Sequence, residues 1–319
     1  ETMLPLMARM RPLYNLFVTS APGKAAMRFA GLTALPALPP LSLRRALSEA
    51  RIPVATPQAL AALSPDQRAR SVVFVPDAFT EHFDPQILLD AVDIAGRLGF
   101  RAFVPPPLVN GKALHVHGYL GRFETVAGRS ARLLDRLAQT GVPLVGIDPS
   151  MTLTYRSEYA GSAATRTGAH VQLPQEWLVT ALERIHAPAP STDRPPHRLM
   201  AHCTERTNAP ASANQWKAVF AKLGVDLSLV ETGCCGMAGT FGHEVRNRGL
   251  SEKLYRMSWR PALAEAQPDD VLMATGYSCR SQVKLMEKRQ MPHPLQIIRA
   301  ILQEEAQTTG QRAVSACRS

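Results

Sequence analysis

Four of the five cysteines lie where they could bind a single metal centre. Cys203 precedes the adjacent pair Cys234 and Cys235 by 31 positions, and Cys279 follows Cys235 by 44. Thiolate sulfur is a common ligand of iron–sulfur clusters and of zinc. Five cysteines in 319 residues are too few for a disulfide scaffold, so their clustering indicates metal or redox chemistry. The fifth, Cys317, lies apart in the polar C-terminal stretch.

The stretch around the adjacent cysteines is rich in glycine. Gly233, Gly236 and Gly239 all fall within residues 231–244. Glycine permits left-handed backbone conformations and a close approach to a bound group, and this density does not suit the interior of a helix or strand. We expect a tight loop whose backbone N–H groups point at the sulfurs, with a helix beginning near His243.

The adjacency of Cys234 and Cys235 separates two kinds of metal site. Neighbouring cysteines cannot easily take two tetrahedral positions on one small ion, but they can reach two irons of a larger cluster. Zinc sites more often space their cysteines by two to four residues. The pattern therefore predicts a 4Fe-4S cluster held by Cys203, Cys234, Cys235 and Cys279. A zinc site with four cysteine ligands is the alternative, and four small buried thiols without a metal are the third possibility.

Histidines and arginines stand beside these cysteines. His202 and His243 could serve as ligands, hydrogen-bond donors or proton carriers, although a histidine in such a place is often only packed or solvated. Arg206, Arg246 and Arg280 could offset the negative charge of the thiolates and favour their deprotonation.

The elements that must position these residues alternate between strand and helix in two similar rounds. Strands are expected at 71–75, 100–104 and 142–147, and again at 198–202, 225–231 and 271–275; helices are expected at 85–98, 118–139, 211–223 and 244–266. Such alternation predicts parallel sheets with right-handed crossovers. The cysteines follow the carboxyl ends of the second set of strands, and these ends meet at one edge of a sheet.

The two rounds are also related by a constant spacing. Ala78 lies 125 positions before Cys203, the pair 109–110 lies 125 before the adjacent cysteines, and Met151 lies 128 before Cys279. We interpret this as an internal duplication whose first copy has lost its cysteines. The predicted divisions are a leader arm at 1–70, a degenerate repeat at 71–160, a connector at 161–196, a cluster-binding repeat at 197–305 and a flexible tail at 306–319.

Composition limits the function classes. The chain is 45% hydrophobic and 19% charged, as in globular proteins, and it lacks a run of 18 uncharged apolar residues that could span a membrane. Its first residues lack the order of a secretory signal, and because the chain begins with Glu we expect a piece of something longer. The net charge is +10, and residues 1–70 carry +6 of it with nine Lys or Arg against three Asp or Glu. Elsewhere the signs are interspersed, which argues against a nucleic-acid-binding protein. We expect the arm to be a solvated linker, or to touch a partner domain or an acidic surface.

On these residues the chain resembles the cysteine-rich CCG domain family. That family pattern is a cysteine, some thirty-odd residues, Cys-Cys-Gly, a similar gap and then Cys-x-x-Cys, usually present twice. Cys203, Cys234, Cys235 and Cys279 match it. The run CCGMAGTFGHE at 234–244 most resembles the C-terminal region of bacterial FAD-linked D-2-hydroxyglutarate dehydrogenases. The chain is also similar to the iron–sulfur subunits of glycolate oxidase and anaerobic glycerol-3-phosphate dehydrogenase and to the B subunit of heterodisulfide reductase.

The resemblance implies an α/β fold of two duplicated parallel-sheet CCG-type domains, the first degenerate. It implies an iron–sulfur electron-transfer region of a flavin-linked D-2-hydroxy-acid dehydrogenase, of the D-2-hydroxyglutarate or D-lactate type, that passes electrons from FAD to an acceptor. The FAD would lie in a flavin-binding domain, accompanied by a ferredoxin-like domain, elsewhere in the same polypeptide or in a partner subunit. The alternative is a docking domain of such an enzyme that binds zinc through four cysteines and has no redox role. The expected location is the cytoplasm, with peripheral contact at the inner membrane surface left open.

Two departures from the family pattern matter. Gly276 stands where the first cysteine of the closing Cys-x-x-Cys belongs, which leaves four thiolates instead of five. A five-cysteine non-cubane cluster is therefore not expected, whereas a cubane or a zinc ion fits four thiolates. The first repeat has none of the ligands and is expected to act as a scaffold.

Overall fold

A computed structural model describes residues 4–33, 35–184 and 194–316 of the chain. The leader forms short helices, as its many prolines predict: α1 (Leu4–Arg9), α2 (Arg11–Thr19), α3 (Ala21–Phe29), α4 (Leu43–Glu49), α5 (Pro57–Ala61) and α6 (Pro65–Ala69). It is folded back on itself instead of extended. Asn15 holds the backbone of Leu38 by two hydrogen bonds of 2.8 Å, and the Tyr14 hydroxyl donates to the Pro36 carbonyl over 3.0 Å.

The first repeat is built on a parallel sheet in the order β2-β1-β3-β4. Its strands are β1 (Ser71–Val75), β2 (Arg101–Phe103), β3 (Leu144–Gly146) and β4 (Val171–Gln172). The helices between them are α7 (Ala78–His82), α8 (Pro85–Arg97), α9 (Lys112–Val116), α10 (Leu120–Ala138) and α11 (Pro149–Thr154). Every residue of β1 is buried, as expected for a continuous apolar run at the centre of a parallel sheet.

The second repeat has the parallel order β6-β5-β7, which matches β2-β1-β3 of the first strand by strand. Its strands are β5 (His197–Met200), β6 (Leu227–Leu229) and β7 (Val271–Ala274), and its helices are α13 (Cys203–Asn208), α14 (Ser212–Lys222), α15 (Arg248–Ala264), α16 (Tyr277–Glu287) and α17 (Pro294–Ala316). The predicted α/β fold with two parallel-sheet units is confirmed.

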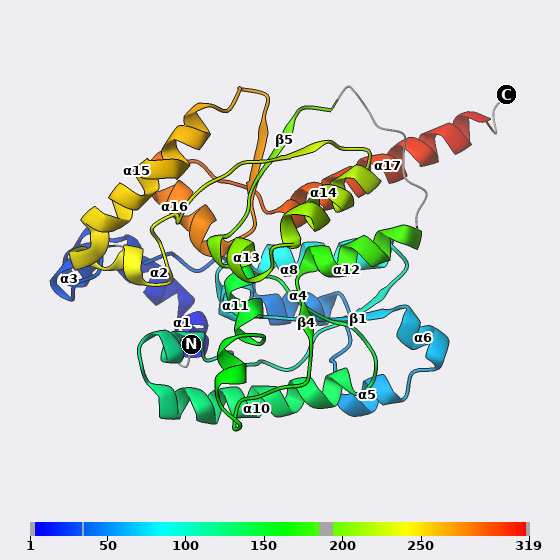
Figure 1. The fold of residues 1–319 in the computed structure, drawn as a ribbon, viewed down its shortest axis with the longest axis horizontal. Coiled ribbons are helices and arrows are strands. Elements are labelled where there is room, and N and C mark those ends of the chain that lie inside the picture. The colour runs from blue at the N-terminus through cyan, green and yellow to red at the C-terminus, as the bar shows by residue number, and fades with distance from the viewer. Residues whose placement is uncertain (1–3, 34, 185–193, 317–319) are drawn as a thin grey trace.

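One hydrophobic cluster spans the two repeats, and each repeat has a further cluster of its own. The connector predicted at 161–196 contributes β4 to the first sheet and then α12 (Pro174–Ala181), and its residues 185–193 lie outside the described part of the chain. Helix α12 packs against α14, and α8 packs against α17. One apolar cluster therefore joins Phe74 and Trp177 to Trp216, Phe220 and Ile298. In Figure 1 these helices lie between β5 above and β1 below.

Three helices differ from the expected boundaries. The helix expected from residue 244 begins at Arg248, because Val245 N–H donates to Gly31 over 2.7 Å and holds Glu244 extended, with φ −89° and ψ 133°. The helix expected from 118 begins at Leu120, after Gly118 at φ +77°. At the C-terminus α17 continues to Ala316, so much of the expected flexible tail is helical. Within the described residues no helix combines the length and the apolarity that a membrane span requires.

Candidate metal centre

The four clustered cysteines lie at one edge of the second sheet. Cys203 is the first residue of α13, directly after β5, and Cys279 is the third residue of α16, after β7. Cys234 and Cys235 lie in the loop that follows β6. Because β5 pairs with both β6 and β7 in parallel, these three loops leave the sheet side by side.

The four sulfurs form a continuous series of contacts. Cys234 shares one hydrogen bond with Cys203 and another with Cys235, and Cys235 shares a further one with Cys279. Cys235 and Cys279 are buried, whereas Cys203 and Cys234 are partly exposed. The structure therefore brings together residues that are up to 76 positions apart in the sequence.

Negative charge in this group is stabilised at Cys234. Hydrogen bonds from Cys203 and then Cys235 lower the pKa of Cys234 far below its ordinary value, and the Gly236 N–H adds a donor 3.4 Å from its sulfur. The pKa values of the two donating thiols move the other way: that of Cys203 is raised by the bond to Cys234 and by burial, and that of Cys235 by its bonds to Cys234 and Cys279.

The glycines of the loop have different tasks. Gly236 has φ +84°, and a Cβ there would lie 2.3 Å from the Ser251 carbonyl oxygen, so this position requires glycine. Gly239 also has a positive φ, of +65°. The Gly233 N–H donates to Ser258 Oγ over 2.9 Å, which ties the loop to α15 instead of to a sulfur. Of the three predicted donors, the one seen at a sulfur is Gly236.

His202 lies within this group. It caps α13, because its Nδ1 accepts a hydrogen bond from Thr204 N–H over 3.1 Å, which places the proton of the neutral ring on Nε2. A Cβ on Gly276 would lie 2.2 Å from His202 Cδ2 and 3.3 Å from Cys279 Sγ. The imidazole thus fills the space that a side chain at the position of the missing fifth cysteine would need.

A buried carboxylate that was not predicted from the sequence lies beside the cysteines and fixes the elements that carry them. Glu205 is fully buried in α13 and accepts hydrogen bonds from Thr275 Oγ1 over 2.5 Å and Trp216 Nε1 over 2.9 Å. Thr275 also accepts from the backbone N–H of His202 over 2.9 Å. Glu205 therefore connects the helix that begins with Cys203 to the end of β7. Its position two residues after a candidate ligand is the only signal in the sequence.

The remaining predicted site residues have partners elsewhere. The His243 carbonyl accepts from Thr33, so this residue joins the loop to the leader. Arg280, one residue after Cys279, pairs with Asp84 of the first repeat over 2.5 Å. Arg206 donates to the Thr232 carbonyl and steadies the cysteine loop, and Arg246 pairs with Glu244 at the surface.

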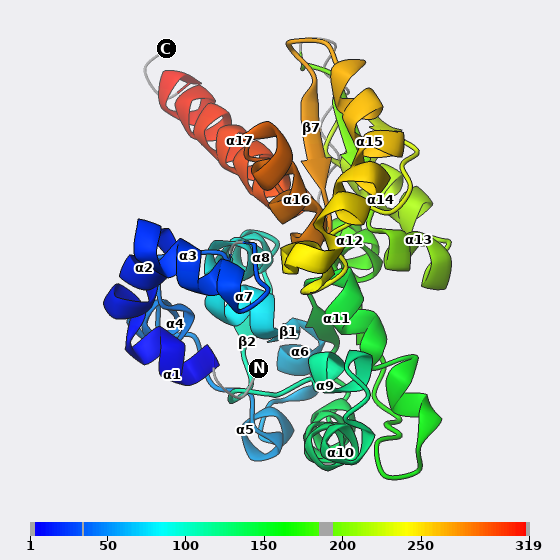
Figure 2. The same ribbon diagram turned by 90° about the vertical axis from the view of Figure 1, so that its left-hand side faces the viewer.

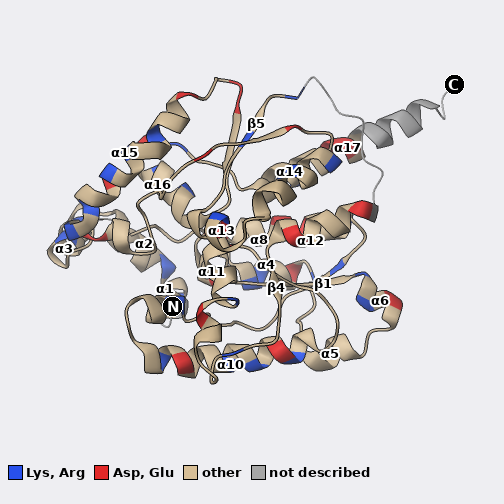
Figure 3. Cartoon of the chain, viewed as in Figure 1, with Lys and Arg blue, Asp and Glu red and all other residues tan. Residues whose placement is uncertain are grey.

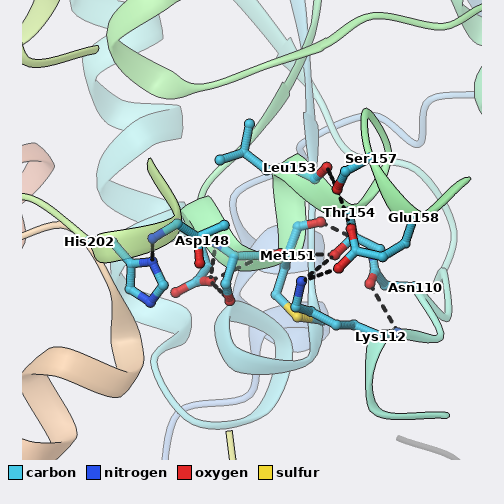
Figure 4. Close-up of polar contacts among 11 residues, drawn as sticks. Asn110, Lys112, Asp148, Met151, Leu153, Thr154, Ser157, Glu158 and His202 are labelled. Carbon is cyan, nitrogen blue, oxygen red and sulfur yellow. Dashed lines mark hydrogen bonds and ion pairs between the residues drawn. The ribbon is translucent and has the colours of Figure 1, made fainter. Parts of the chain in front are cut away.

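The corresponding edge of the first repeat is a closed polar network (Figure 4). Asn110 Nδ2 donates to the Met151 carbonyl over 3.1 Å. Lys112 Nζ donates to Thr154 Oγ1 over 3.0 Å and to Glu158 over 2.7 Å. These hydrogen bonds lie at the edge that corresponds to the cysteine site of the second repeat. The role of the first repeat as a scaffold stays a prediction.

Comparison with known proteins identifies relatives over nearly the whole chain. D-2-hydroxyglutarate dehydrogenase of Pseudomonas putida is 45% identical over 299 residues, which are 93% of this chain and 29% of that protein. The enzyme of the same name from Escherichia coli is 39% identical over 304 residues, 95% of this chain and 30% of that protein. The chain is homologous to one segment of bacterial D-2-hydroxyglutarate dehydrogenases. The resemblance predicted from the CCGMAGTFGHE run is confirmed.

The D-2-hydroxyglutarate dehydrogenase relatives are much longer, since this chain spans less than a third of their length. A more distant relative, the C subunit of the anaerobic glycerol-3-phosphate dehydrogenase of Escherichia coli, is 19% identical over 237 residues, 71% of this chain and 58% of that protein. No family model matches the chain.

The donor set suits a thiolate-bound centre. Four sulfurs meet without a carboxylate among them, and soft thiolate ligands select iron–sulfur clusters, zinc or Cu(I). In the described part of the chain, however, no group of three or more His, Cys, Asp or Glu is placed to hold a single metal ion. The ligand types of the site therefore suit a thiolate-bound group, whereas the positions of the side chains in this structure do not suit one small ion.

Proposed function

We propose that this chain is the iron–sulfur electron-transfer region of a flavin-linked dehydrogenase that acts on a D-2-hydroxy acid, with D-2-hydroxyglutarate as the leading substrate. The observation that carries the proposal is the contact series from Cys203 through Cys234 and Cys235 to Cys279 at one sheet edge. Its supporting observation is that relatives 36–45% identical over more than nine-tenths of the chain are D-2-hydroxyglutarate dehydrogenases.

Cys203, Cys234, Cys235 and Cys279 would hold a 4Fe-4S cluster, which when bound supplies one-electron transfer. The chain itself supplies the environment. Gly236 N–H donates to Cys234, and burial excludes water from Cys235 and Cys279. Ligation requires deprotonated sulfur, so binding would release the protons that the Cys203 and Cys235 thiols otherwise hold.

The flavin and a ferredoxin-like domain would lie in the part of the enzyme that this chain lacks, or in a partner subunit. The lengths of the relatives support this, because more than two thirds of each lies outside the matched segment. Electrons would pass from FAD through the cysteine site to an acceptor. A cytoplasmic location, with or without contact at the inner membrane surface, remains a prediction from the resemblance.

A zinc-binding docking domain with four cysteine ligands is the second candidate. The glycine at position 276 favours it, because the remaining four thiolates equal the usual coordination number of structural zinc. In that case the site would stabilise the second repeat and carry no electrons.

Anaerobic purification followed by metal analysis tests both candidates. About four irons and four sulfides per chain, visible absorbance and an EPR signal on reduction are expected for the cluster. One zinc per chain without iron would instead support the zinc-binding docking domain. Cys235→Ser is expected to abolish metal uptake, whereas Cys317→Ser is the matched control and should retain it. Equal metal content in the two variants would reject both candidates.

A further inference from the structure

Large apolar side chains are exposed along the outer side of the leader helices. They recur every three or four residues through α1 and α2, and a last one ends α3, where Phe29 is 97% exposed; they are Leu6, Met10, Leu13, Leu16, Phe17 and Phe29. The opposite side of α2 and α3 is already packed, with Val18 and Met27 buried. Helix α2 is therefore apolar on two sides, and an exposed apolar surface of this kind on a folded domain marks an interaction site.

A second exposed apolar group adjoins the first. Val245, Leu250 and Met257 belong to the segment that follows the cysteine loop, and Met257 is 69% exposed. Hydrogen bonds join this segment to the end of α3, from Val245 N–H to Gly31 and from Thr33 N–H to His243, over 2.7 and 2.6 Å. Figure 2 shows α1, α2, α3 and α15 on the side of the molecule that faces the viewer. We call these nine apolar residues together the leader face.

The same segments hold most of the excess positive charge. Residues 4–29 contain four Lys or Arg and no Asp or Glu, and residues 244–260 contain five against two. These two segments thus carry +7 of the net charge of +10. Figure 3 shows this concentration of basic residues along α15 and in α3. The leader face is therefore an apolar surface with a basic rim.

The leader face also lies beside the candidate metal centre. Gly242 N–H donates to the Met237 carbonyl over 2.8 Å, so the segment that binds the leader closes back on the loop that contains Cys234 and Cys235. The segment that carries Val245 is therefore hydrogen-bonded on one side to the leader and is continuous on the other with the loop that supplies two of the four sulfurs.

We propose that the leader face docks the flavin-bearing part of the enzyme, through an apolar surface on that part that is rimmed by carboxylates. The identity of the occupant rests on the proposed function, whereas the existence of the surface does not. The length of the relatives supports an occupant of this kind, since more than two thirds of their chain lies outside the segment matched here. Opposite charge on the two rims would fix the orientation of docking.

The shape of the surface favours a protein over a membrane. An interfacial membrane anchor is a helix that lies in one plane with its apolar side in the lipid. The leader face instead combines three helices of six to nine residues with a segment more than 200 positions away in sequence. Side-chain hydrogen bonds from Tyr14 and Asn15 tie α2 to residues 36–38 and fix the fold of the leader. A surface assembled in this way suits a shaped protein partner.

Lysine footprinting tests the proposal in a full-length protein. The probe is the Pseudomonas putida relative with its matched segment replaced by this chain, compared with this chain alone. Acetylation of Lys24 in α3 and Lys253 in α15, the helices that carry parts of the leader face, is expected to fall severalfold in the full-length protein. Lys217, exposed on α14, is the internal control and should not change. Equal acetylation of Lys24 in both proteins would overturn the proposal.

A pair of variants separates docking from general loss of structure. Leu16→Asp with Phe29→Asp should restore acetylation of Lys24 and Lys253 in the full-length protein to the level of the isolated chain. Val116→Asp with Leu120→Asp is the matched control, because these residues are similarly exposed on α9 and α10 and do not belong to the leader face. Protection that persists in the first pair would contradict the proposal.

Two further measurements identify other occupants. Binding of the full-length protein to phosphatidylglycerol vesicles, lost in Leu16→Asp with Phe29→Asp, would overturn the proposal in favour of a membrane. Protection of Lys24 that grows with the concentration of the isolated chain would overturn it in favour of a second copy. Iron and sulfide content is measured on the same samples. Protection of Lys24 and Lys253 without iron would leave docking intact and reject the electron-transfer role. Iron without protection would support the electron-transfer role and overturn docking.

Discussion

Asp148 of the first repeat accepts a hydrogen bond from the backbone N–H of Tyr277 in the second, with 2.9 Å between Oδ2 and N. Its other oxygen, Oδ1, accepts from Ser150 N–H and caps its own helix, α11. The N-cap of α16 is Gly276, which has no side chain to do this. The repeat without cysteines therefore supplies the cap of the helix that carries Cys279.

We expect Asp148→Ala to destabilise the protein by about 2 kcal/mol, because each lost N-cap typically costs about 1 kcal/mol and two helices lose theirs. Metal retention should fall as well, since α16 loses its fixed start. Urea unfolding and metal analysis measure the two effects. Asp148→Asn is the control: it keeps an acceptor for α11 and loses the one for Tyr277, so its effect should be intermediate. An Asp148→Ala protein as stable as the wild type would contradict this account.

Asp77 is expected to make stability depend on pH. Burial, and then the charge of Asp148, raise the pKa of this carboxyl from 3.8 to about 7. Between these values the folded state holds a proton that the unfolded state releases, so stability falls as pH rises through this window, by about 1.4 kcal/mol for each unit of pKa difference. Above pH 7 the loss is complete.

Asp77→Asn removes this titration. The free energy of unfolding of the variant, relative to that of the wild type, should therefore be higher at pH 8 than at pH 5. Urea unfolding of both proteins at the two pH values gives the comparison, and the difference between the proteins cancels the contributions of other groups. The same difference at pH 5 and pH 8 would show that Asp77 does not titrate in this range.

The fold and the meeting of the cysteines were accessible from the sequence because both follow from local patterns. Strand and helix alternate in the chain, and the carboxyl ends of parallel strands share an edge, which is enough to bring Cys203 and Cys279 toward the adjacent pair. The constant spacing of about 125 residues also identified the duplication. The hydrogen-bond network around Lys112 could not be predicted in this way, because its residues lie in the first repeat and match no ligand motif in the sequence.

The contacts between the repeats and the leader could not be predicted in this way. The hydrogen bond from Tyr277 N–H to Asp148 depends on how α8 and α17 pack the two sheets together. The delayed start of α15 depends on the hydrogen bond from Val245 N–H to Gly31, which joins residues more than 200 positions apart. Such contacts are tertiary, and they override the local propensity that would extend the helix to residue 244.

Glu205→Gln is expected to destabilise the protein by roughly 3 kcal/mol, because a buried carboxylate with several donors is replaced by an amide that must turn an N–H toward them. The amide keeps one oxygen, so its NH2 group would face either the hydroxyl of Thr275 or the indole N–H of Trp216, and that donor would lose its acceptor. Since Thr275 also holds His202, metal binding should weaken. Chemical unfolding and metal titration test this, with exposed Glu183→Gln as the control that should change neither. A wild-type metal affinity in Glu205→Gln would separate Glu205 from the site.

Restoring the missing fifth cysteine should fail unless His202 is also changed. In Gly276→Cys the new Cβ would lie 2.2 Å from His202 Cδ2, so the ring must move, and with it the cap of α13. The single variant should therefore lose stability and metal, whereas Gly276→Cys combined with His202→Ala should recover part of both, because the space is free. A double-mutant cycle on the free energy of unfolding, with iron content in parallel, measures the coupling. If the losses in the two single variants simply add, His202 does not occupy the place of the absent ligand.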